Sequence, residues 1–176
     1  MKIACYYENE TIKSGIVKDN LLYPSQFNGD LTDLINSWPC EMDAGVPVLI
    51  DQVRLAPPVI RPSKIICIGL NYLDHVKEGG EEAPNSPVIF AKFPNSIIGH
   101  GESIEWDRNL TGKVDFEAEL AVIVGRQSRY LTMENALEHV FGYTCANDVS
   151  ARDLQFGDKQ WVRGKTLDTF CPLGPW

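Results

Sequence analysis

"VDFEAEL", residues 114–120, alternates apolar and acidic side chains without a break. Strict alternation of this kind is typical of a β-strand with one apolar and one polar face. Side chains at i, i+2 and i+4 of a strand lie on the same face, about 7 Å from one to the next, so Asp115, Glu117 and Glu119 are expected to form a row. The apolar run that follows, residues 121–124, predicts that the strand continues into a core.

Three carboxylates in a row are unfavourable unless something compensates their charge. Like charges repel one another, and each costs free energy to remove from water. A cation bound by Glu117 and Glu119 would remove both penalties, because both side chains leave the strand on the same side. The alternative is a strand face exposed to solvent, on which paired carboxylates need no ligand.

The composition limits the possible functions. The chain has 176 residues, of which 44 % are hydrophobic and 23 % charged, as in ordinary globular proteins. The net charge of −8 argues against nucleic acid or an anionic membrane as a partner. No stretch is long enough to span a membrane, and no signal-peptide run opens the chain. The five cysteines are far apart and form no CxxC motif, so we expect no disulfide framework or zinc site, and a cytoplasmic location.

The first 60 residues are expected to form a small N-terminal α+β domain. Three short apolar runs before residue 25 predict strands. Asp30 is a suitable N-cap for a short helix over 31–38, whose apolar residues recur at helical spacing. The prolines at 57, 58 and 62 mark the domain boundary, and residues 61–176 then form the catalytic domain.

The second region contains more strands than helices. "KIICIGL" (64–70) predicts a strand buried on both faces, and "VIFAKF" (88–93) and "SIEW" (103–106) predict two more. "TMENALEHVFG" (132–142) predicts a helix that begins after Thr132. Since strands and helices do not alternate regularly, the pattern favours an α+β, mostly-β fold over a doubly wound sheet.

Two further segments contain candidate site residues. "ANDVSARD" places Asp148 at the end of an expected strand, which is a common position for a metal ligand. "NYLDHVKEGG" places His75 and Glu78 at i and i+3, on one side of a helical turn. A carboxylate beside an imidazole suits a general base, although such a pair is also common on a solvated helix.

Five motifs occur in a familiar order: "IGLNYLDHVKEGG", "PVIFAKFPNSIIGHG", "VDFEAELAVIVG", "GYTCANDVSARDLQ" and "WVRGKTLDTFCPLGPW". With them the chain resembles the fumarylacetoacetate hydrolase superfamily, and in particular its bacterial branch. That branch includes acylpyruvate hydrolases, oxaloacetate decarboxylases, 2-hydroxyhepta-2,4-diene-1,7-dioate isomerases and ureidoglycolate lyase-like proteins. The resemblance covers residues 62–176 and implies a catalytic domain built as a mixed β-roll.

The resemblance also implies the site residues. It implies a metal site at Glu117, Glu119 and Asp148. These are hard oxygen donors that favour Mg²⁺ or Mn²⁺, with Ca²⁺ as a further candidate. It places a catalytic base pair, His75 and Glu78, on a mobile lid. The remaining implied residues are Lys165, which faces the substrate, and Arg152 and Gln155, which bind it. A surface position for Lys165 and an ion pair of Arg152 with a carboxylate are the alternatives.

The expected activity is metal-assisted cleavage of a C–C bond in a small 2-oxo acid through an enolate, most simply hydrolysis as in acylpyruvate hydrolases. Decarboxylation and isomerisation share the enolate step and remain open. The resemblance implies a homodimer and further strands after "GPW". The roll is therefore expected to be incomplete in this chain, which by itself could be an inactive fragment that associates through exposed strands.

Overall fold

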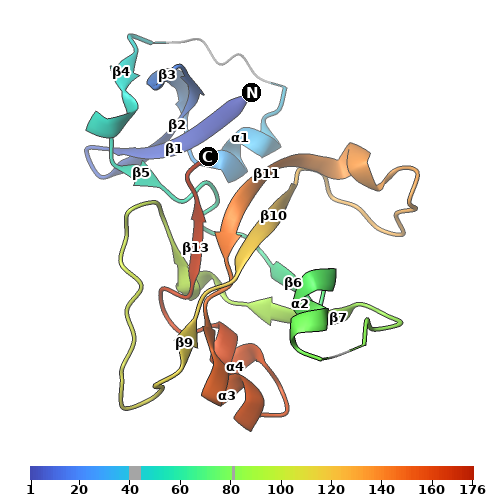
Figure 1. Ribbon diagram of the computed structural model, residues 1–176. Helices are drawn as coiled ribbons and strands as arrows, with labels where there is room; N and C mark the ends of the chain where they lie inside the picture. Colours follow the sequence, from blue (N-terminus) through green and yellow to red (C-terminus); the bar gives the residue numbers. More distant parts are fainter. Residues whose placement is uncertain (40–44, 81) are drawn as a thin grey trace.

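The computed structural model describes residues 1–39, 45–80 and 82–176, apart from the side chains of Gln26, Asn28 and His75. Cys40 lies outside this part. Strands dominate the chain, and they form two larger sheets and two short ribbons (Figure 1). The mostly-β prediction is therefore confirmed. Among the described helices, none has the length and apolar character needed to cross a membrane.

The first sheet is built from the first 56 residues. Its order is β4 (Val48–Leu49), β3 (Leu21–Asn28), β2 (Thr11–Lys18), β1 (Lys2–Glu8) and β5 (Leu55–Ala56), and all pairs are antiparallel. The two hairpins at its centre turn at Asn9–Glu10 and Asp19–Asn20, where all four residues have positive φ. Such a pair of left-handed residues makes the two-residue turn that matches strand twist.

Helix α1 (Leu31–Asn36) packs on this sheet. The Asp30 carboxylate accepts hydrogen bonds from the amides of Thr32 and Asp33, so the predicted N-cap is confirmed. Leu31 and Leu34 are buried against Cys5 and other residues of the sheet. Ile123 and Phe141 from the second sheet also pack against this cluster. The division of the chain at residue 60 stays a prediction.

The second sheet has the order β10 (Ala118–Val124), β11 (Val140–Asn147), β13 (Cys171–Gly174) and β8 (Ile97–Ile98). Beside it lie two ribbons, β9 (Val114–Asp115) with β12 (Ser150–Ala151), and β6 (Ile65–Gly69) with β7 (Val88–Lys92). The short helices are α2 (Leu73–Glu78), α3 (Arg152–Gly157) and α4 (Val162–Lys165), and the 3₁₀ turns are η1 (Ile50–Gln52), η2 (Pro94–Ser96) and η3 (Ala136–His139).

Three expected elements differ from the structure. The predicted helix over 132–142 is only the turn η3, because Val140 and the residues after it pair with β10 instead. Residues 103–106 form no strand, since the backbone of Glu105 bonds to the Thr169 hydroxyl and not to a ladder. Strand β6 is not buried on both faces: Ile66 is 57 % exposed.

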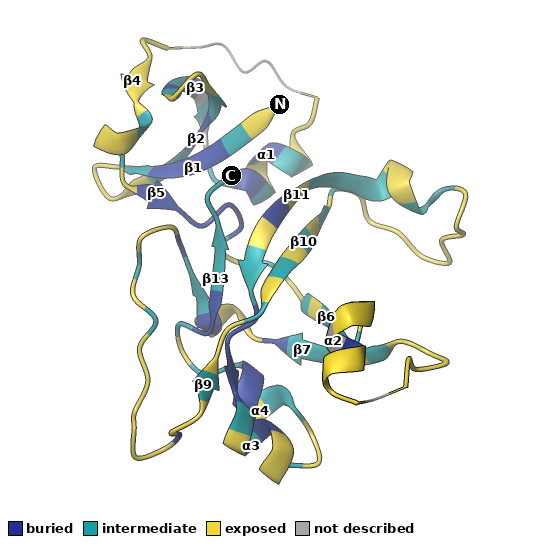
Figure 2. Ribbon diagram, in the orientation of Figure 1, coloured by how far each residue is buried: buried dark blue, intermediate teal, exposed yellow. Residues whose placement is uncertain are grey.

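The acidic stretch 114–120 is two strands, not one. Residues 114–115 pair with β12, whereas 118–124 pair with β11, so the chain changes partner at Phe116 and Glu117. Exposure alternates along β10: Leu120, at 60 % exposure, and every second residue after it face outward, whereas Glu119, Ala121 and Ile123 are half-buried (Figure 2). Glu117 and Glu119 are half-buried, whereas Asp115 is exposed.

Candidate metal centre

Three carboxylates converge where β10 and β11 meet. Glu117 precedes β10, Glu119 lies within it, and Asp148 follows β11. The pairing of Ala118 with Asn147 brings the strand ends together, and the amide of Asp148 donates to the carbonyl of Glu117 at 3.0 Å. One oxygen from each of the three carboxylates lies within 4.8 Å of the others. The structure thus brings together the three residues expected to bind a metal.

Lys165 lies between two of these carboxylates. Its Nζ lies 2.9 Å from Oε2 of Glu117 and 3.0 Å from Oδ2 of Asp148. The side chain is only 2 % exposed, and the ammonium also lies 5.2 Å from the ring centroid of Phe90. The alternative of a surface lysine is therefore excluded for Lys165.

Gly164 allows Lys165 to reach this position. Helix α4 crosses so close to α3 that a Cβ on Gly164 would lie 2.7 Å from the Gln155 amide nitrogen and 2.9 Å from the Ala151 carbonyl oxygen. Only glycine fits such a contact between backbones. Trp161, just before α4, packs edge-on against Phe90 with centroids 5.5 Å apart. Close packing on both sides thus fixes the end of α4 beside the carboxylates.

Arg152 holds Glu117 from the other side. Its Nη1 lies 2.7 Å from Oε1 of Glu117, and its Nε and Nη2 donate to Oδ2 of Asp115 at 3.0 and 2.8 Å. The same Nη1 donates to the buried Gln155 at 2.9 Å. These contacts occupy four of the five N–H groups of the guanidinium. The ion pair with a carboxylate, one of the two expectations for Arg152, is thus present, and a substrate contact by Arg152 or Gln155 stays a prediction.

The negative charge is not fully compensated at Glu119. Burial raises the pKa of the Glu119 carboxyl to about 7, and the charges of Asp148 and Glu117 add to the effect. Burial also acts to raise the pKa of Glu117, but Lys165 and Arg152 outweigh it and hold that pKa below its usual value. The ionised form of Glu119 is therefore unfavourable in the metal-free protein, and a bound cation would stabilise it.

The donor set fits a hard divalent cation. All three candidate ligands are carboxylates, which magnesium, manganese and calcium prefer. Burial raises the pKa of the nearby Cys67 thiol to about 12, so the thiol remains protonated near neutral pH and is a poor metal ligand. Glu117, Glu119 and Asp148 are the residues that would hold the ion.

The segment with the expected base pair is connected to the same strand. His75 and Glu78 lie in α2; the His75 side chain is outside the described part of the chain, and Glu78 is exposed. The hydroxyl of Tyr72, just before α2, accepts a hydrogen bond from the amide of Leu120 in β10 at 3.1 Å. The residue before the N-terminal end of α2 is thus hydrogen-bonded to the backbone next to Glu119.

Lys92 is a site residue that the sequence pattern did not reveal. It ends β7 and is 3 % exposed, with Nζ 2.7 Å from Oδ1 of Asp148. A lone lysine in the apolar run 88–93 was the available signal, because lysine is almost never fully buried without a partner. The sequence alone does not predict which carboxylate Lys92 contacts.

Comparison with known proteins finds a matching family and relatives of similar sequence. Residues 64–176 match the family model described as "Fumarylacetoacetate (FAA) hydrolase C-terminal". An oxaloacetate tautomerase of Bacillus subtilis is 47 % identical over 129 residues, which are 72 % of this chain and 43 % of that protein. A mitochondrial oxaloacetate tautomerase of Bos taurus is 47 % identical over 133 residues, 74 % of this chain and 42 % of that protein.

Solved structures share the fold over nearly the whole of this chain. Fumarylacetoacetate hydrolase from Exiguobacterium antarcticum superposes with a TM-score of 0.86 at 42 % identity, over 99 % of this chain and 65 % of that one. The chain spans less than half the length of the curated relatives named above and about two thirds of this solved structure.

Proposed function

The chain belongs to the fumarylacetoacetate hydrolase family, and from that premise we propose that its carboxylate cluster catalyses keto–enol tautomerisation of a small 2-oxo diacid of the oxaloacetate type. The observation that carries the proposal is the position of Lys165, whose buried ammonium lies at the oxygens of Glu117 and Asp148. The reaction is the one in the names of the bacterial and bovine relatives.

The charges of the cluster favour an anionic substrate. It contains four acidic and three basic side chains, so its formal charge is −1. They are Asp115, Glu117, Glu119 and Asp148, and Lys92, Arg152 and Lys165. A divalent cation would reverse the sign and leave a single positive charge, which attracts a carboxylate substrate.

Tautomerisation moves one proton. In the direction from enol to ketone, the O–H bond of the enol breaks and a C–H bond forms on the neighbouring carbon, and no co-reactant is consumed. The protein must stabilise the negative charge on the substrate oxygen while the proton is transferred. A divalent cation held by Glu117, Glu119 and Asp148 supplies Lewis-acid stabilisation of that charge when bound.

Lys165 is the described side chain best placed to help. Its ammonium has three N–H donors, and the described contacts to Glu117 and Asp148 take two of them. The third is available to a substrate oxygen. Because the side chain is almost fully buried, this donor acts where water screens charge weakly and is therefore more effective than in solution.

The proton itself is assigned to His75 and Glu78, as the resemblance implies. Glu78 would orient the imidazole, and His75 would carry the proton between carbon and oxygen. The positive φ of Gly80, with no other described residue within 4 Å of a Cβ built there, is compatible with a segment that moves over the site.

C–C bond hydrolysis is the second candidate. It is supported by the match to the Exiguobacterium antarcticum fumarylacetoacetate hydrolase. Hydrolysis shares the enolate but also needs a water molecule activated by His75, whereas tautomerisation does not. The two activities are thus distinguished by substrate and not by the metal ligands.

The test compares three assays on the same protein. Ultraviolet absorbance of the enol follows tautomerisation of oxaloacetate, a coupled assay for pyruvate follows decarboxylation, and loss of the diketone absorbance follows acylpyruvate hydrolysis. Each is run with Mg²⁺, with Mn²⁺ and with a chelator. Faster loss of enol that depends on metal, without pyruvate release, is the expected result.

The matched variants are Glu119→Gln and Glu138→Gln. Glu138 is exposed in η3, just before β11 begins, whereas Asp148 follows the other end of β11, so its variant should behave as wild type. Metal-dependent acylpyruvate hydrolysis without any effect on the enol would reject the tautomerase and support the second candidate.

A further inference from the structure

Two buried lysines bind the two oxygens of one carboxylate. Lys92 Nζ lies 2.7 Å from Oδ1 of Asp148, and Lys165 Nζ lies 3.0 Å from Oδ2. Asp148 itself is 4 % exposed. Lys165 is shared between Asp148 and Glu117, whereas the described carboxylate contact of Lys92 is to Asp148, so the two lysines are expected to differ in role.

The N–H groups of Lys92 are fully used. Besides Oδ1 of Asp148, its Nζ donates to the carbonyl of Val149 at 3.2 Å and to the carbonyl of Lys165. An ammonium has three donors, so none is left for a substrate. These contacts connect the end of β7 to the turn after β11 and to the end of α4.

We propose that Lys92 is a positioning residue that holds Asp148 with Oδ2 directed at the metal centre, while Lys165 is the lysine that meets the substrate. The inference rests on the proposed metal site. The described contacts of Lys92 include neither Glu117 nor Glu119, so it would act through the orientation of one ligand. Loss of such a partner typically weakens metal binding about 10–100-fold.

Charge and position make opposite predictions for Lys92. Removing a buried positive charge next to a cation site should strengthen cation binding, because the repulsion between like charges disappears. Removing the group that fixes Asp148 should weaken binding. The sign of the change in affinity therefore separates the two roles.

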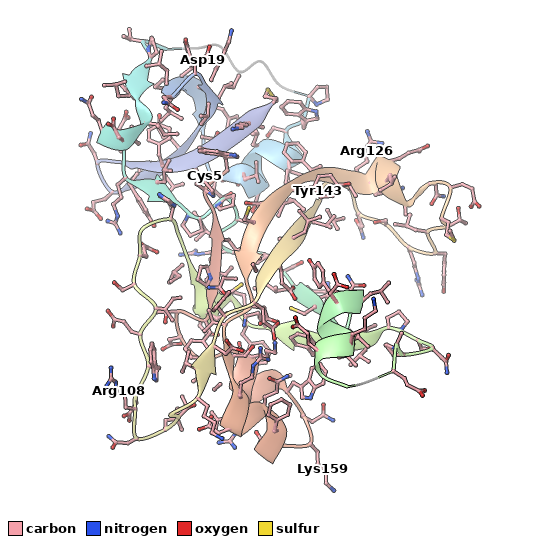
Figure 3. The ribbon with its side chains drawn as sticks, in the orientation of Figure 1. Cys5, Asp19, Arg108, Arg126, Tyr143 and Lys159 are labelled. Atoms are coloured by element: carbon pink, nitrogen blue, oxygen red, sulfur yellow. The ribbon has the colours of Figure 1, made fainter. Side chains whose placement is uncertain are left out.

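The experiment measures Mn²⁺ affinity by isothermal titration calorimetry on the 176-residue chain. Lys92→Met, which keeps length but not charge, is expected to bind Mn²⁺ about 10–100-fold more weakly than wild type. Lys92→Arg, which keeps a charged donor, is expected to recover most of the affinity. Lys159→Met is the control, since Lys159 is exposed in the loop between α3 and α4 (Figure 3).

Two results would overturn the proposal. Tighter Mn²⁺ binding by Lys92→Met would show that Lys92 acts only by charge. Unchanged binding with a lower melting temperature would show that it serves only the stability of the fold. If Lys92→Met does not fold, Lys92→Gln, which keeps a neutral donor, takes its place with the same expected order of affinities.

A second readout does not depend on the metal. In crystals of the metal-free variant, the carboxylate of Asp148 should have turned so that Oδ2 no longer meets Nζ of Lys165. An unmoved Asp148 would reject the positioning role. If wild type binds no Mn²⁺, the proposed metal site fails, and the orientation of Asp148 alone decides the role of Lys92.

Discussion

Lys165 Nζ lies 3.0 Å from Oδ2 of Asp148, one of the three carboxylates that a cation at this centre would also use. The ammonium and the cation therefore compete for the same charge. Lys165→Met should raise the affinity for Mn²⁺, because a positive charge leaves the site, and should lower turnover about 10²–10³-fold, because a donor to the substrate oxygen is lost. Calorimetry and the enol assay measure the two effects.

Lys159→Met is again the matched control and should change neither quantity. Weaker Mn²⁺ binding by Lys165→Met would contradict the competition, and unchanged turnover would remove Lys165 from the reaction.

The raised pKa of Glu119 predicts how stability depends on pH in the metal-free protein. The pKa of the Glu119 carboxyl is 4.5 in the unfolded chain and about 7 in the folded protein. Between these values the folded state holds a proton that the unfolded state has lost. The contribution of Glu119 to the free energy of unfolding therefore falls as pH rises through this window and is constant above it.

Glu119→Gln removes this contribution. Urea denaturation in the presence of a chelator should show that the variant gains stability relative to wild type between about pH 4.5 and about pH 7. Glu138→Gln should keep the pH dependence of wild type. If Glu119→Gln follows the same curve as wild type, the carboxyl is not destabilised by burial and its neighbours.

The contact between α3 and α4 predicts opposite effects for two glycines. In Gly164→Ala the new methyl would lie 2.7 Å from the Gln155 amide nitrogen, so the helices must separate, at a cost of about 1–3 kcal/mol. Gly157, the last residue of α3, has nothing within 4 Å of a Cβ. Gly157→Ala should be neutral or stabilise by up to about 1 kcal/mol.

Chemical denaturation measures both glycine variants. Equal stability of Gly164→Ala and Gly157→Ala would show that α4 does not approach α3 as closely as described, and the position of Lys165 would then need revision.

For His75 the prediction comes from the sequence resemblance. His75→Ala should lower kcat by about 10²–10⁴-fold, since a general base is lost, while the affinity for Mn²⁺ stays the same because no ligand changes. Kinetics on oxaloacetate and on an acylpyruvate, with calorimetry alongside, measure these effects. Full turnover on both substrates would exclude His75 as the proton carrier.

Local signals in the sequence were enough for several parts of the molecule. The Asp30 cap, the helix after it and the alternation around Glu117 and Glu119 depend on neighbours within a few residues, and the structure contains all three. The acidic residues on one face of this stretch also predicted where the carboxylate cluster with Asp148 forms. The two-residue spacing of Glu117 and Glu119 was enough to predict that both carboxylates lie on one side, although the stretch forms two strands and Glu117 lies just before the second.

The tertiary structure decided what lies opposite those side chains. Residues 132–142 have a helical pattern, yet Val140 pairs with Val124, since ladder hydrogen bonds and packing outweigh weak helix propensity. No local signal shows that Lys92, 56 residues before Asp148, meets its carboxylate, or that Lys165 reaches both Asp148 and Glu117. Burial and charge pairing depend on which distant segments the fold brings into contact, and spacing along the chain carries no record of that.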